Sequence, residues 1–365
     1  MGSTPPTVKT LSQRRAALWR LGLGLAAVAY PMPEARAVVS NWPSRTIRLL
    51  VAYPVGGVSD QVARDLAQQM SDQLSARVFV ENRAGASGSI AMEHLMRSAP
   101  DGYTLGFAAV TALGPAAQAK SNTRGSEITG CTDRISHHQH NRLPTQLPSQ
   151  LSGSTPGSTG LSLIPVAGVM HTPVLIAGTK SLRTESFGEM LRWSKARPDA
   201  LRWATTGEGT TGHTVMEQIS RATGIRVVHV PYKGGGQQIT DAIGGHFEVL
   251  STNVAQPQLN AIAAGQLTAF AVGAARRLPV LPDIPTLSEL GIPQANLDSL
   301  FGVFTPPQTP SGLVRRIHEE VSRAMHDSPL KGKLLAMSNI PFTGSSSDFA
   351  AEVLRRSVLG PRETC

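Results

Sequence analysis

The chain has 365 residues, of which 41% are hydrophobic, which is enough for two domains with cores of their own and excludes a disordered or collagen-like chain. Its net charge is +9, but five basic residues and one acid lie within residues 1–37, so +4 belongs to that segment and +5 to the rest. No run of Lys and Arg interleaved with aromatic residues occurs. The charge therefore indicates a solvated surface, and we expect no nucleic-acid partner.

The first 37 residues have the pattern of a secretory signal peptide. A basic stretch up to Arg20 precedes an apolar run at 21–29, and Ala35-Arg36-Ala37 has the small-x-small form that signal peptidase accepts. The apolar run is far shorter than the ~20 residues that span a bilayer, which disfavours a membrane anchor. Arg14-Arg15 matches a twin-arginine signal only loosely. We predict ordinary export to the periplasm with cleavage after about Ala37.

The cysteine and histidine content argues against a metal or thiol site. Cys131 and Cys365 could form a disulfide after export, although a domain of this size does not require one. His, Cys, Asp and Glu residues do not occur at zinc-ligand spacing, and the histidines at 137–140 lie in a polar tract where solvation is the default. We predict no metal site.

The mature chain alternates apolar runs of strand length with amphipathic helices. Val62, Leu66 and Met70 recur every fourth residue behind the capping pair Ser59-Asp60, which predicts a helix there. Three other predicted helices cover 90–98, 186–196 and 311–325. Two more are predicted at one end only: one begins near 211, and another ends at 243. The predicted strands cover 47–53, 78–80, 104–108, 173–177, 201–205, 226–230, 247–250, 267–272 and 301–304. This alternation is typical of the α/β class, with a parallel sheet covered by helices.

Residues 120–163 depart from that pattern. Ser, Thr, Gly, Pro, Gln and His dominate this stretch, which has little periodic apolar content. A loop of this length without secondary structure is unusual in a compact domain. Two interpretations fit: a disordered insertion, or a stretch of altered reading frame.

Three glycine-rich loops have the composition and placement to bind an anion. They cover 53–60, 83–89 and 205–213, and each follows a predicted strand and precedes a predicted helix. Glycine permits close approach of the backbone, and the free N–H groups at a helix start favour negative charge. In open α/β sheets such loops lie at the carboxyl ends of the strands, where ligands bind. Two facing lobes would therefore form a cleft for a carboxylate.

Two motifs favour other functions more weakly. Residues 207–212 match G-x-G-x-x-G, but the next strand offers no acid for a nucleotide ribose. Ser87 lacks the G-x-S-x-G elbow of a nucleophile, and no His or Asp partner is placed by the sequence. A hydroxyl hydrogen bond to a ligand is the preferred role for Ser87. We expect no enzymatic activity, with an α/β hydrolase or a nucleotide-dependent enzyme as the alternative.

Several single residues have a structural role as well as a functional one. Asp60 could orient a ligand amine or cap its helix, and capping is favoured. His213 could face the cleft or be a solvated helix residue. Tyr53 and Tyr232 could line the cleft or pack at strand ends, and Lys233 could attract an anion or remain a solvated charge.

Six segments of the chain form a specific combination when taken in order. They are Trp42-Pro43-Ser44-Arg45-Thr46-Ile47, residues 53–60, residues 80–88, residues 99–105, residues 229–234, and residues 281–286 followed by 289–291. Together they resemble the Bug-type extracytoplasmic solute receptors, the substrate-binding proteins of tripartite tricarboxylate transporters. The resemblance covers residues 42 to about 118 and about 164 to 354.

The resemblance implies a two-lobed, Venus-flytrap fold of the periplasmic-binding-protein type II-like class. It predicts two crossover segments, near 174–177 and 267–272. The resulting domains are residues 38–177 and 267–365 for lobe 1, which includes the irregular insertion 120–163, and residues 178–266 for lobe 2. It also implies a small carboxylate ligand: a di- or tricarboxylate, an acidic amino acid or an aromatic acid. We expect backbone groups and ordered waters to hold this ligand, with no cofactor.

Position by position, the resemblance predicts the ligand-binding residues. The set is Tyr53, Gly56, Gly57 and Asp60 in the first loop, Ala86, Ser87 and Gly88 in the second, Thr206, Gly207, Gly209, Thr210 and His213 in the second-lobe loop, and Asn253. After the third strand, residues 108–111 are less polar than in the family, which weakens the case for a direct contact there.

Two departures from the family pattern lead to a further hypothesis. Residues 119–163 replace a shorter segment, and the tail from Leu354 to Cys365 stops short of the family's last helix. Both cysteines lie in these stretches. A frameshifted or degenerate family member therefore remains an alternative, and losing a terminal helix would expose apolar surface at ~25 cal/mol per Å².

The leading hypothesis is a monomeric periplasmic receptor that closes around a carboxylate and delivers it to membrane transporter subunits. The alternative of the same class is a receptor that reports the ligand to a sensor kinase.

Overall fold

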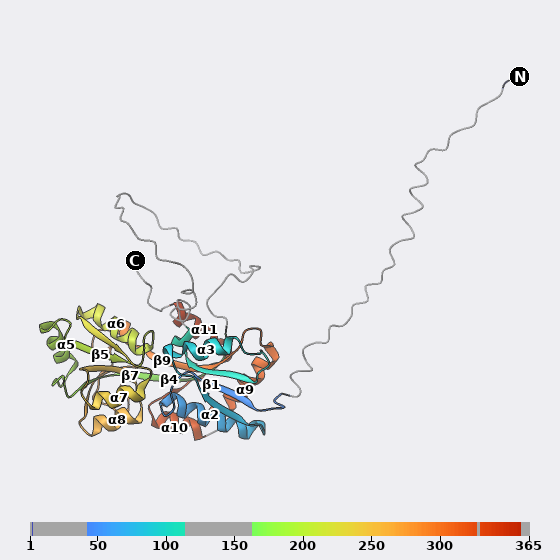
Figure 1. Ribbon diagram of the computed structural model, residues 1–365, viewed down its shortest axis with the longest axis horizontal. Coiled ribbons are helices and arrows are strands. Elements are labelled where there is room, and N and C mark those ends of the chain that lie inside the picture. The colour runs from blue at the N-terminus through green and yellow to red at the C-terminus, as the bar shows by residue number, and fades with distance from the viewer. Residues whose placement is uncertain (1, 3–41, 114–162, 327–328, 359–365) are drawn as a thin grey trace.

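The computed structural model describes residues 2, 42–113, 163–326 and 329–358 (Figure 1). Several predictions lie outside the described residues: the signal peptide with its cleavage site, nearly all of the irregular segment 120–163, both cysteines, and the end of the tail from 359 onward. Within the ranges given, no helix has the length and apolar character needed to cross a membrane.

A mixed sheet of ten strands runs through both lobes in the order β2-β1-β3-β9-β4-β7-β5-β6, with β8 and β10 also paired to β4. The strands are β1 (Ile47–Val51), β2 (Val78–Asn82), β3 (Thr104–Ala109), β4 (Ile164–Thr179), β5 (Leu201–Thr205), β6 (Val227–Pro231), β7 (Val249–Asn253), β8 (Leu267–Gly273), β9 (Asp298–Thr305) and β10 (Ile340–Pro341). The helices are α2 (Val58–Leu74), α3 (Ser89–Met96), α5 (Phe187–Ala196), α6 (Thr211–Thr223), α7 (Gly235–Ile243), α8 (Gln256–Ala263), α9 (Ser311–His326), α10 (Pro329–Ala336) and α11 (Ser346–Val358).

Lobe 1 is built on β2, β1 and β3, which are parallel, with β9 antiparallel beside β3. Helices α2, α9 and α10 bury residues such as Leu66, Ile317 and Leu334 in a core on one face of this sheet. Helices α3 and α11 bury Leu95 and Phe349 on the other face. Figure 1 shows these helices on opposite sides of the strands, as expected for the α/β class.

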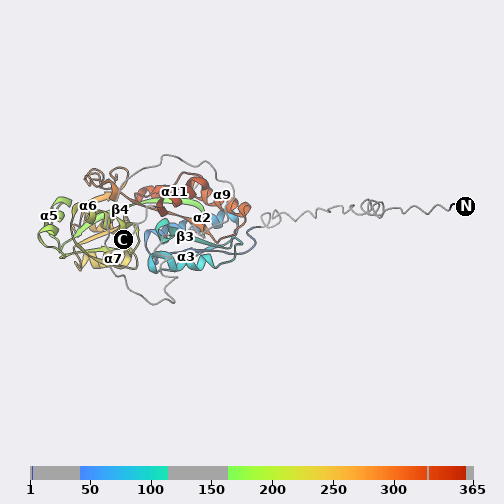
Figure 2. The same ribbon diagram turned by 90° about the horizontal axis from the view of Figure 1, so that it is seen from above.

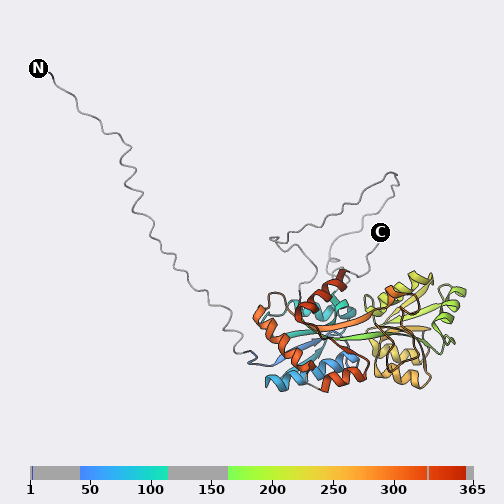
Figure 3. The ribbon, with the colours of Figure 1, turned by 180° about the vertical axis from the view of Figure 1, so that it is seen from behind.

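Lobe 2 repeats this layered arrangement. Strands β6, β5 and β7 are parallel, and β7 pairs antiparallel with β4. Helices α5 and α6 bury Met190 and Ile219 against one face, while α7 and α8 bury Ala242 and Ala261 against the other. The Ser186 hydroxyl accepts from the Glu189 N–H, and the Glu189 carboxylate accepts from the Glu185 N–H, so α5 begins where its sequence predicts. Figures 2 and 3 show the two lobes side by side along the long axis of the molecule.

The first crossover lies in β4, close to its predicted position. The first part of β4 pairs with β9 as far as Pro173, and from Val174 onward β4 pairs with β7 and β8 in lobe 2. The second crossover was predicted at 267–272 and is wrong in position. Strand β8 pairs with the lobe 2 half of β4, and Phe270 and Ile292 belong to the lobe 2 core. The chain therefore returns to lobe 1 at the start of β9, about thirty residues later than the strand pattern suggested.

The C-terminal region also differs from its prediction. Helix α11 continues through Leu354 to Val358, and Phe349 and Val353 are fully buried in the lobe 1 core. Residues 346–358 therefore form a helix over the sheet, beyond the last helix that the sequence predicted at 311–325. Helices α8 and α10 were also missed, because both are only eight residues long.

Candidate functional site

The first glycine-rich loop joins β1 to α2, and hydrogen bonds to Asp60 stabilise it. The Asp60 carboxylate accepts hydrogen bonds from the Gly56 N–H at 2.9 Å, Arg64 Nε at 3.0 Å and Asn82 Nδ2 at 2.8 Å. Burial alone would raise the pKa of Asp60, but these donors outweigh it and hold the pKa below its usual range. Asp60 is 2% exposed, so its carboxylate fixes the shape of the loop from within lobe 1.

Tyr53 begins the same loop and lies between the lobes. Its ring packs edge-on against Phe301 with centroids 5.7 Å apart, and its hydroxyl accepts from the Ala109 N–H at 3.1 Å. Burial raises the pKa of Tyr53 to about 12, although the Ala109 hydrogen bond opposes the shift. The phenol is therefore neutral at physiological pH. Because the hydroxyl oxygen only accepts from Ala109, its own proton is available to a ligand.

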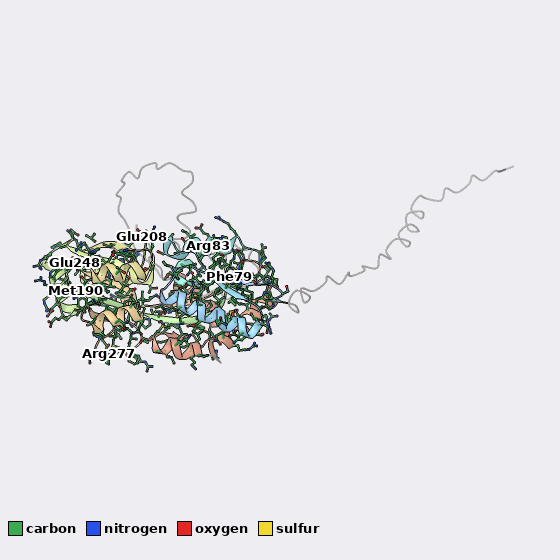
Figure 4. The ribbon with its side chains drawn as sticks, turned by 60° about the horizontal axis from the view of Figure 1, so that its bottom comes forward. Phe79, Arg83, Met190, Glu208, Glu248 and Arg277 are labelled. Carbon is green, nitrogen blue, oxygen red and sulfur yellow. The ribbon has the colours of Figure 1, made fainter. Side chains whose placement is uncertain are left out.

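The second loop, 85–89, touches lobe 2 directly. Ala86 and Ser87 have positive φ values of 44° and 55°, and the Ser87 hydroxyl donates to the backbone carbonyl of Glu208. A second contact between the lobes joins Pro54 to Gly234, where a Cβ on the glycine would lie 3.0 Å from Pro54 Cδ. Figure 4 shows Glu208 on the side of lobe 2 that meets lobe 1, whereas Met190 and Glu248 lie on the far side.

The second-lobe loop joins β5 to α6. The Thr210 hydroxyl accepts from the His213 N–H at 3.4 Å, which caps the helix, and it donates to the Gly207 carbonyl at 2.7 Å. Gly207 has φ of +139°, and a Cβ there would lie 2.7 Å from Ser87 Oγ and 3.2 Å from the Tyr232 carbonyl. Glycine is required at 207 both for its backbone conformation and for the close approach of the lobes.

His213 lies behind this loop. Its Nδ1 accepts from the Gly209 N–H at 3.0 Å, and its ring stacks on His229 with centroids 4.4 Å apart. Burial lowers the pKa of His229, and the neighbouring His213 lowers it further. The ring of His213 therefore supports the loop backbone from within lobe 2.

A small cavity of about 20 Å³ lies at the base of the cleft. Hydroxyl and amide groups from both lobes surround it, and Ser299 Oγ donates across the crossover to Asn253 Oδ1 at 2.7 Å. Its lining residues are Tyr53, Ala109, Thr111, Thr206, Thr210, Thr211, Gly212, Thr252, Asn253, Ser299 and Phe301. We call this the base cavity. The start of α6 forms one wall of it.

A larger space of about 110 Å³ adjoins the base cavity. It lies between the first loop and the starts of α7 and α8, and we call it the side chamber. Its lining residues are Tyr53 to Ser59, Gln61, Thr206, Gly234, Gly235, Gly236, Ile239, Thr252, Asn253, Ala255, Gln256, Pro257 and Gln258. Tyr53, Thr206, Thr252 and Asn253 line both spaces.

The structure sorts the predicted site residues into groups. Six of the thirteen line the base cavity, the side chamber or both, four line a separate outer cavity, and three line none of these spaces. Tyr53, Gly56, Gly57, Thr206, Thr210 and Asn253 line the base cavity, the side chamber or both. Ala86, Ser87, Gly207 and Gly209 line an outer cavity of about 260 Å³ that also includes Lys233. Asp60, Gly88 and His213 line none of these spaces.

Several residues that line these spaces were not predicted from the sequence. Thr252 lines both spaces, while Gly235, Gln256 and Gln258 line the side chamber. The available signal was position, because Gly235 follows β6, Thr252 lies near the carboxyl end of β7, and Gln256 and Gln258 follow β7. Thr111, whose contact was judged weak, also lines the base cavity.

Chemical groups for catalysis are sparse in this arrangement. Ser87 donates to a backbone carbonyl, so its hydroxyl is not paired with a base. Among the described residues, no three His, Cys, Asp or Glu side chains are grouped closely enough to hold a metal ion. The arrangement instead presents N–H and hydroxyl groups to a space between two lobes, which suits reversible binding.

Comparison with known proteins agrees with this fold. BugT of Bordetella pertussis (strain Tohama I / ATCC BAA-589 / NCTC 13251) is 26% identical over 94% of this chain and 96% of its own length. A solved "periplasmic transporter" superposes with a TM-score of 0.73 at 26% identity, covering 87% of this chain and 96% of that one. The R. palustris protein Rpa4515, solved with adipate, has a TM-score of 0.70 at 26% identity, covering 87% and 95%.

The solved periplasmic binding protein BugD shares the fold, with a TM-score of 0.70 at 22% identity over 87% of this chain and 95% of that one. The family described as "Tripartite tricarboxylate transporter family receptor" matches residues 62–121 and 160–357. These two ranges contain most of both lobes and nearly all of α11. The chain therefore belongs to the tripartite tricarboxylate transporter receptor family, as its six sequence segments predicted.

Proposed function

We propose that this chain is an exported receptor that captures a small carboxylate between its lobes and presents the closed form to a membrane transporter. The observation that carries the proposal is the chemistry of the cleft. In the described part of the chain, the base cavity and the side chamber are lined by N–H groups, hydroxyls and amides, and by no Asp, Glu, Lys or Arg. Such a lining attracts an anion through helix starts without placing an acid against it.

Binding requires a ligand that favours the closed arrangement of the lobes. The Ser87–Glu208 and Pro54–Gly234 contacts already join the lobes on the two sides of the cleft. A carboxylate that contacts both Tyr53 of lobe 1 and the start of α6 in lobe 2 would add binding energy only when the lobes are together. Closure is then a population shift driven by that difference in affinity.

The relatives support the class of ligand. Rpa4515 was solved with adipate, a dicarboxylate, and its fold and length match this chain closely. By analogy, we propose that this receptor binds a small carboxylate. We also propose that it has no catalytic activity of its own. Both lobes that form the cleft belong to one chain, so we propose that the receptor works as a monomer.

Partner and location form the second part of the proposal. The family description names a transporter, and one similar structure is called a periplasmic transporter. We propose that the chain is exported through its N-terminal signal, cleaved near Ala37, and docks on transporter subunits. A membrane pull-down with the liganded receptor tests the partner, since capture of a sensor kinase in place of transporter subunits would overturn this assignment.

The test of carboxylate binding uses the chain expressed with its own export signal and purified from the periplasm. Thermal unfolding is measured against di- and tricarboxylates, acidic amino acids and aromatic acids, because a ligand that binds the native state raises the midpoint by mass action. N-terminal sequencing of the same material locates the cleavage site. A selective, saturable rise with one acid supports the proposal, whereas a cooperative transition that no acid shifts overturns it.

A matched pair of variants locates the site. Gly57 lines the side chamber and has a φ of −78°, so a valine is tolerated by the backbone but would fill the space above the loop. Gly332 lies on the exposed side of α10, where a Cβ meets nothing within 4 Å. We expect Gly57→Val to abolish the ligand-induced shift and Gly332→Val to keep it.

A further inference from the structure

The second-lobe loop at residues 206–210 has two roles in the cleft. Thr206 and Thr210, at its two ends, line the base cavity. The hydroxyl of Ser87 in lobe 1 donates to the backbone carbonyl of Glu208, in the middle of the loop. The loop therefore forms part of the cleft wall and also carries one of the contacts that hold the lobes together.

His213, in the first turn of α6, supports the backbone of this loop through a nitrogen that carries no proton. Its Nδ1 accepts a hydrogen bond from the Gly209 N–H at 3.0 Å. A neutral imidazole has one N–H group, so the proton of this ring is on Nε2, which lies 3.6 Å from Glu217 Oε1. The Gly209 N–H can bind the ring only while Nδ1 is unprotonated.

A second histidine stacks on the first. The ring of His229, in β6, has its centroid 4.4 Å from that of His213, and the two planes differ by 18°. His229 Nε2 lies 2.8 Å from Thr205 Oγ1, and this hydroxyl also accepts from the Gly207 N–H at 3.2 Å. Both imidazoles are therefore connected to the loop. Two charged rings at this separation repel each other, so the pair takes up one proton much more readily than two.

The surroundings of the pair decide which ring takes the first proton. Burial lowers the pKa of His229, the charge of His213 lowers it further, and the charge of Glu208 opposes the shift. His213 lies beside Glu217, whose other carboxylate oxygen is 3.9 Å from Arg221 on the same helix. The first proton therefore goes to His213, and His229 remains neutral.

The other elements that pack against α6 bring no further charge to the pair. Within the described residues these are β5, β7 and the turn Pro293–Ala295. Arg202 is the one ionisable residue in them, and its guanidinium pairs with Glu248, which Figure 4 shows on the far side of lobe 2. The protonation of His213 is therefore controlled by its contacts with the loop, with His229 and with Glu217.

Protonation of His213 removes the support of the loop. A proton on Nδ1 would face the Gly209 N–H, so two donors would meet where one hydrogen bond is now made. The proton and the Gly209 N–H compete for the same lone pair, and the supported loop is the state with fewer protons. By linkage, this state is favoured at neutral pH and is lost as the pH falls below the ordinary pKa of an imidazole, about 6.5.

We propose that His213 is a positioning residue that makes ligand capture depend on pH, because its neutral ring holds the loop against lobe 1 and its protonated ring releases the loop. The inference rests on the proposed function and adds a means of releasing the carboxylate. His213 lines none of the cleft spaces, so it acts on the ligand through the backbone of Gly209 and through the contact between Ser87 and Glu208.

The first measurement needs no ligand. The chain is labelled with ¹⁵N at histidine, glycine and serine, and NMR spectra are recorded between pH 7.5 and pH 5.5. We expect the Nε2–H tautomer of His213 at pH 7.5, and we expect the amide signals of Gly209 and Ser87 to move as its ring takes up a proton. An Nδ1–H tautomer at pH 7.5, a ring still neutral at pH 5.5, or a Ser87 signal that stays fixed during protonation overturns the inference.

The second measurement tests the consequence for binding, with adipate as the probe because the similar protein Rpa4515 was solved with it. Calorimetry gives the dissociation constant over the same pH range for the parent and two variants. His213→Gln keeps a side-chain oxygen for the Gly209 N–H but cannot titrate. His246→Gln is the matched control, since His246 is also a lobe 2 histidine near an acid, 4.0 Å from Asp241, but its side chain is 67% exposed.

In the parent and in His246→Gln, the dissociation constant should rise about three- to tenfold more between pH 7.5 and pH 5.5 than in His213→Gln, which is the range for one net hydrogen bond. The comparison removes the titration of adipate itself, because all three proteins bind the same acid. Equal pH profiles for the three proteins overturn the inference and leave carboxylate capture intact. If no acid binds the parent at any pH, the proposed function fails, and the NMR titration still decides whether His213 releases the loop.

Discussion

Arg356, in α11, donates to both the carboxylate and the backbone carbonyl of Asp298, at 2.7 and 2.8 Å. Asp298 is the first residue of β9, where the chain returns from lobe 2 to lobe 1, and its carboxylate also contacts His171 Nδ1 in β4 at 3.0 Å. The C-terminal helix is thereby tied to both strands that cross between the lobes.

Replacing Arg356 should destabilise the whole protein. Arg356→Gln leaves the partly buried Asp298 carboxylate without its guanidinium partner, so we expect a loss of about 1–3 kcal/mol in the free energy of unfolding. Arg355 is the matched control, because its side chain is 59% exposed and pairs with Glu352. Arg355→Gln should cost less than about 0.5 kcal/mol. Urea unfolding measures both variants. Equal losses in the free energy of unfolding would show that the Arg356–Asp298 contact contributes no more to stability than an exposed ion pair.

The same cluster predicts how stability depends on pH. Burial alone would raise the pKa of Asp298, but the His171 hydrogen bond and the charge of Arg356 outweigh it and lower the pKa. Hydrogen bonds from Arg355 and Arg356 lower the pKa of Glu352 to about 2. Both groups therefore take up protons more readily in the unfolded chain. Their contribution is complete above an unfolded pKa of roughly 4. The part from Glu352 is lost as the pH falls toward about 2, and the part from Asp298 is lost as the pH falls through its own lowered pKa.

The check is a series of urea unfolding curves between pH 7 and pH 3. The parent should lose stability below about pH 4.5, and Arg356→Gln should lose less over the same range, since its carboxylates are closer to their ordinary pKa values. Parallel curves for the two proteins would show that this cluster does not control the acid response.

Most of the fold could be predicted because the chain carries strong local signals. The largely apolar strand β3 and the periodic helix α2 are each readable from a short stretch of sequence, and the glycine-rich loops mark where strands end. Strand β8 has the same apolar character as a crossover strand, so only its pairing with β4 places it in lobe 2. Pairing between distant segments leaves no local trace in the sequence.

The site was predicted only in part for a related reason. Tyr53 and Gly57 lie in a motif whose proline and glycines mark the end of a strand, and both residues line the side chamber. Gln258 lies in a short helix without a periodic apolar pattern, and it is only 4% exposed in the folded chain. Asp60 is the opposite case. The sequence pattern places this acid in a binding motif, but in the structure its carboxylate accepts hydrogen bonds from groups of its own lobe.

The glycine at position 207 tests whether close approach of the two lobes is needed for ligand binding. Gly207→Ala would place a methyl group 2.7 Å from Ser87 Oγ across the gap, in addition to the strain of an alanine at φ +139°. Gly224 is the control, because it has φ of +69° but a Cβ there meets nothing within 4 Å. We expect Gly224→Ala to lose about 1 kcal/mol of stability and Gly207→Ala to lose more, and only Gly207→Ala to lose at least about tenfold in carboxylate affinity. Equal affinities in calorimetry would show that the closed contact at Ser87 is not needed for binding.

Removing the Tyr53 hydroxyl should lower both the stability of the protein and its affinity for a carboxylate, and the two effects can be measured separately. Tyr53→Phe removes the hydroxyl that accepts from the Ala109 N–H, which leaves a buried donor unsatisfied and should cost about 1–2 kcal/mol of stability. It also removes the O–H group that would donate a hydrogen bond to a carboxylate in the base cavity, so affinity should fall about tenfold or more. Tyr232→Phe is the control, since that hydroxyl donates to Asp241 in the same lobe and burial, with Asp241 adding to it, raises its pKa to about 12 as well. Calorimetry and urea unfolding are measured on each variant. If Tyr53→Phe loses stability but binds the ligand as the parent does, the phenol serves only to support the Ala109 backbone, and the carboxylate must be held by the starts of the lobe 2 helices alone.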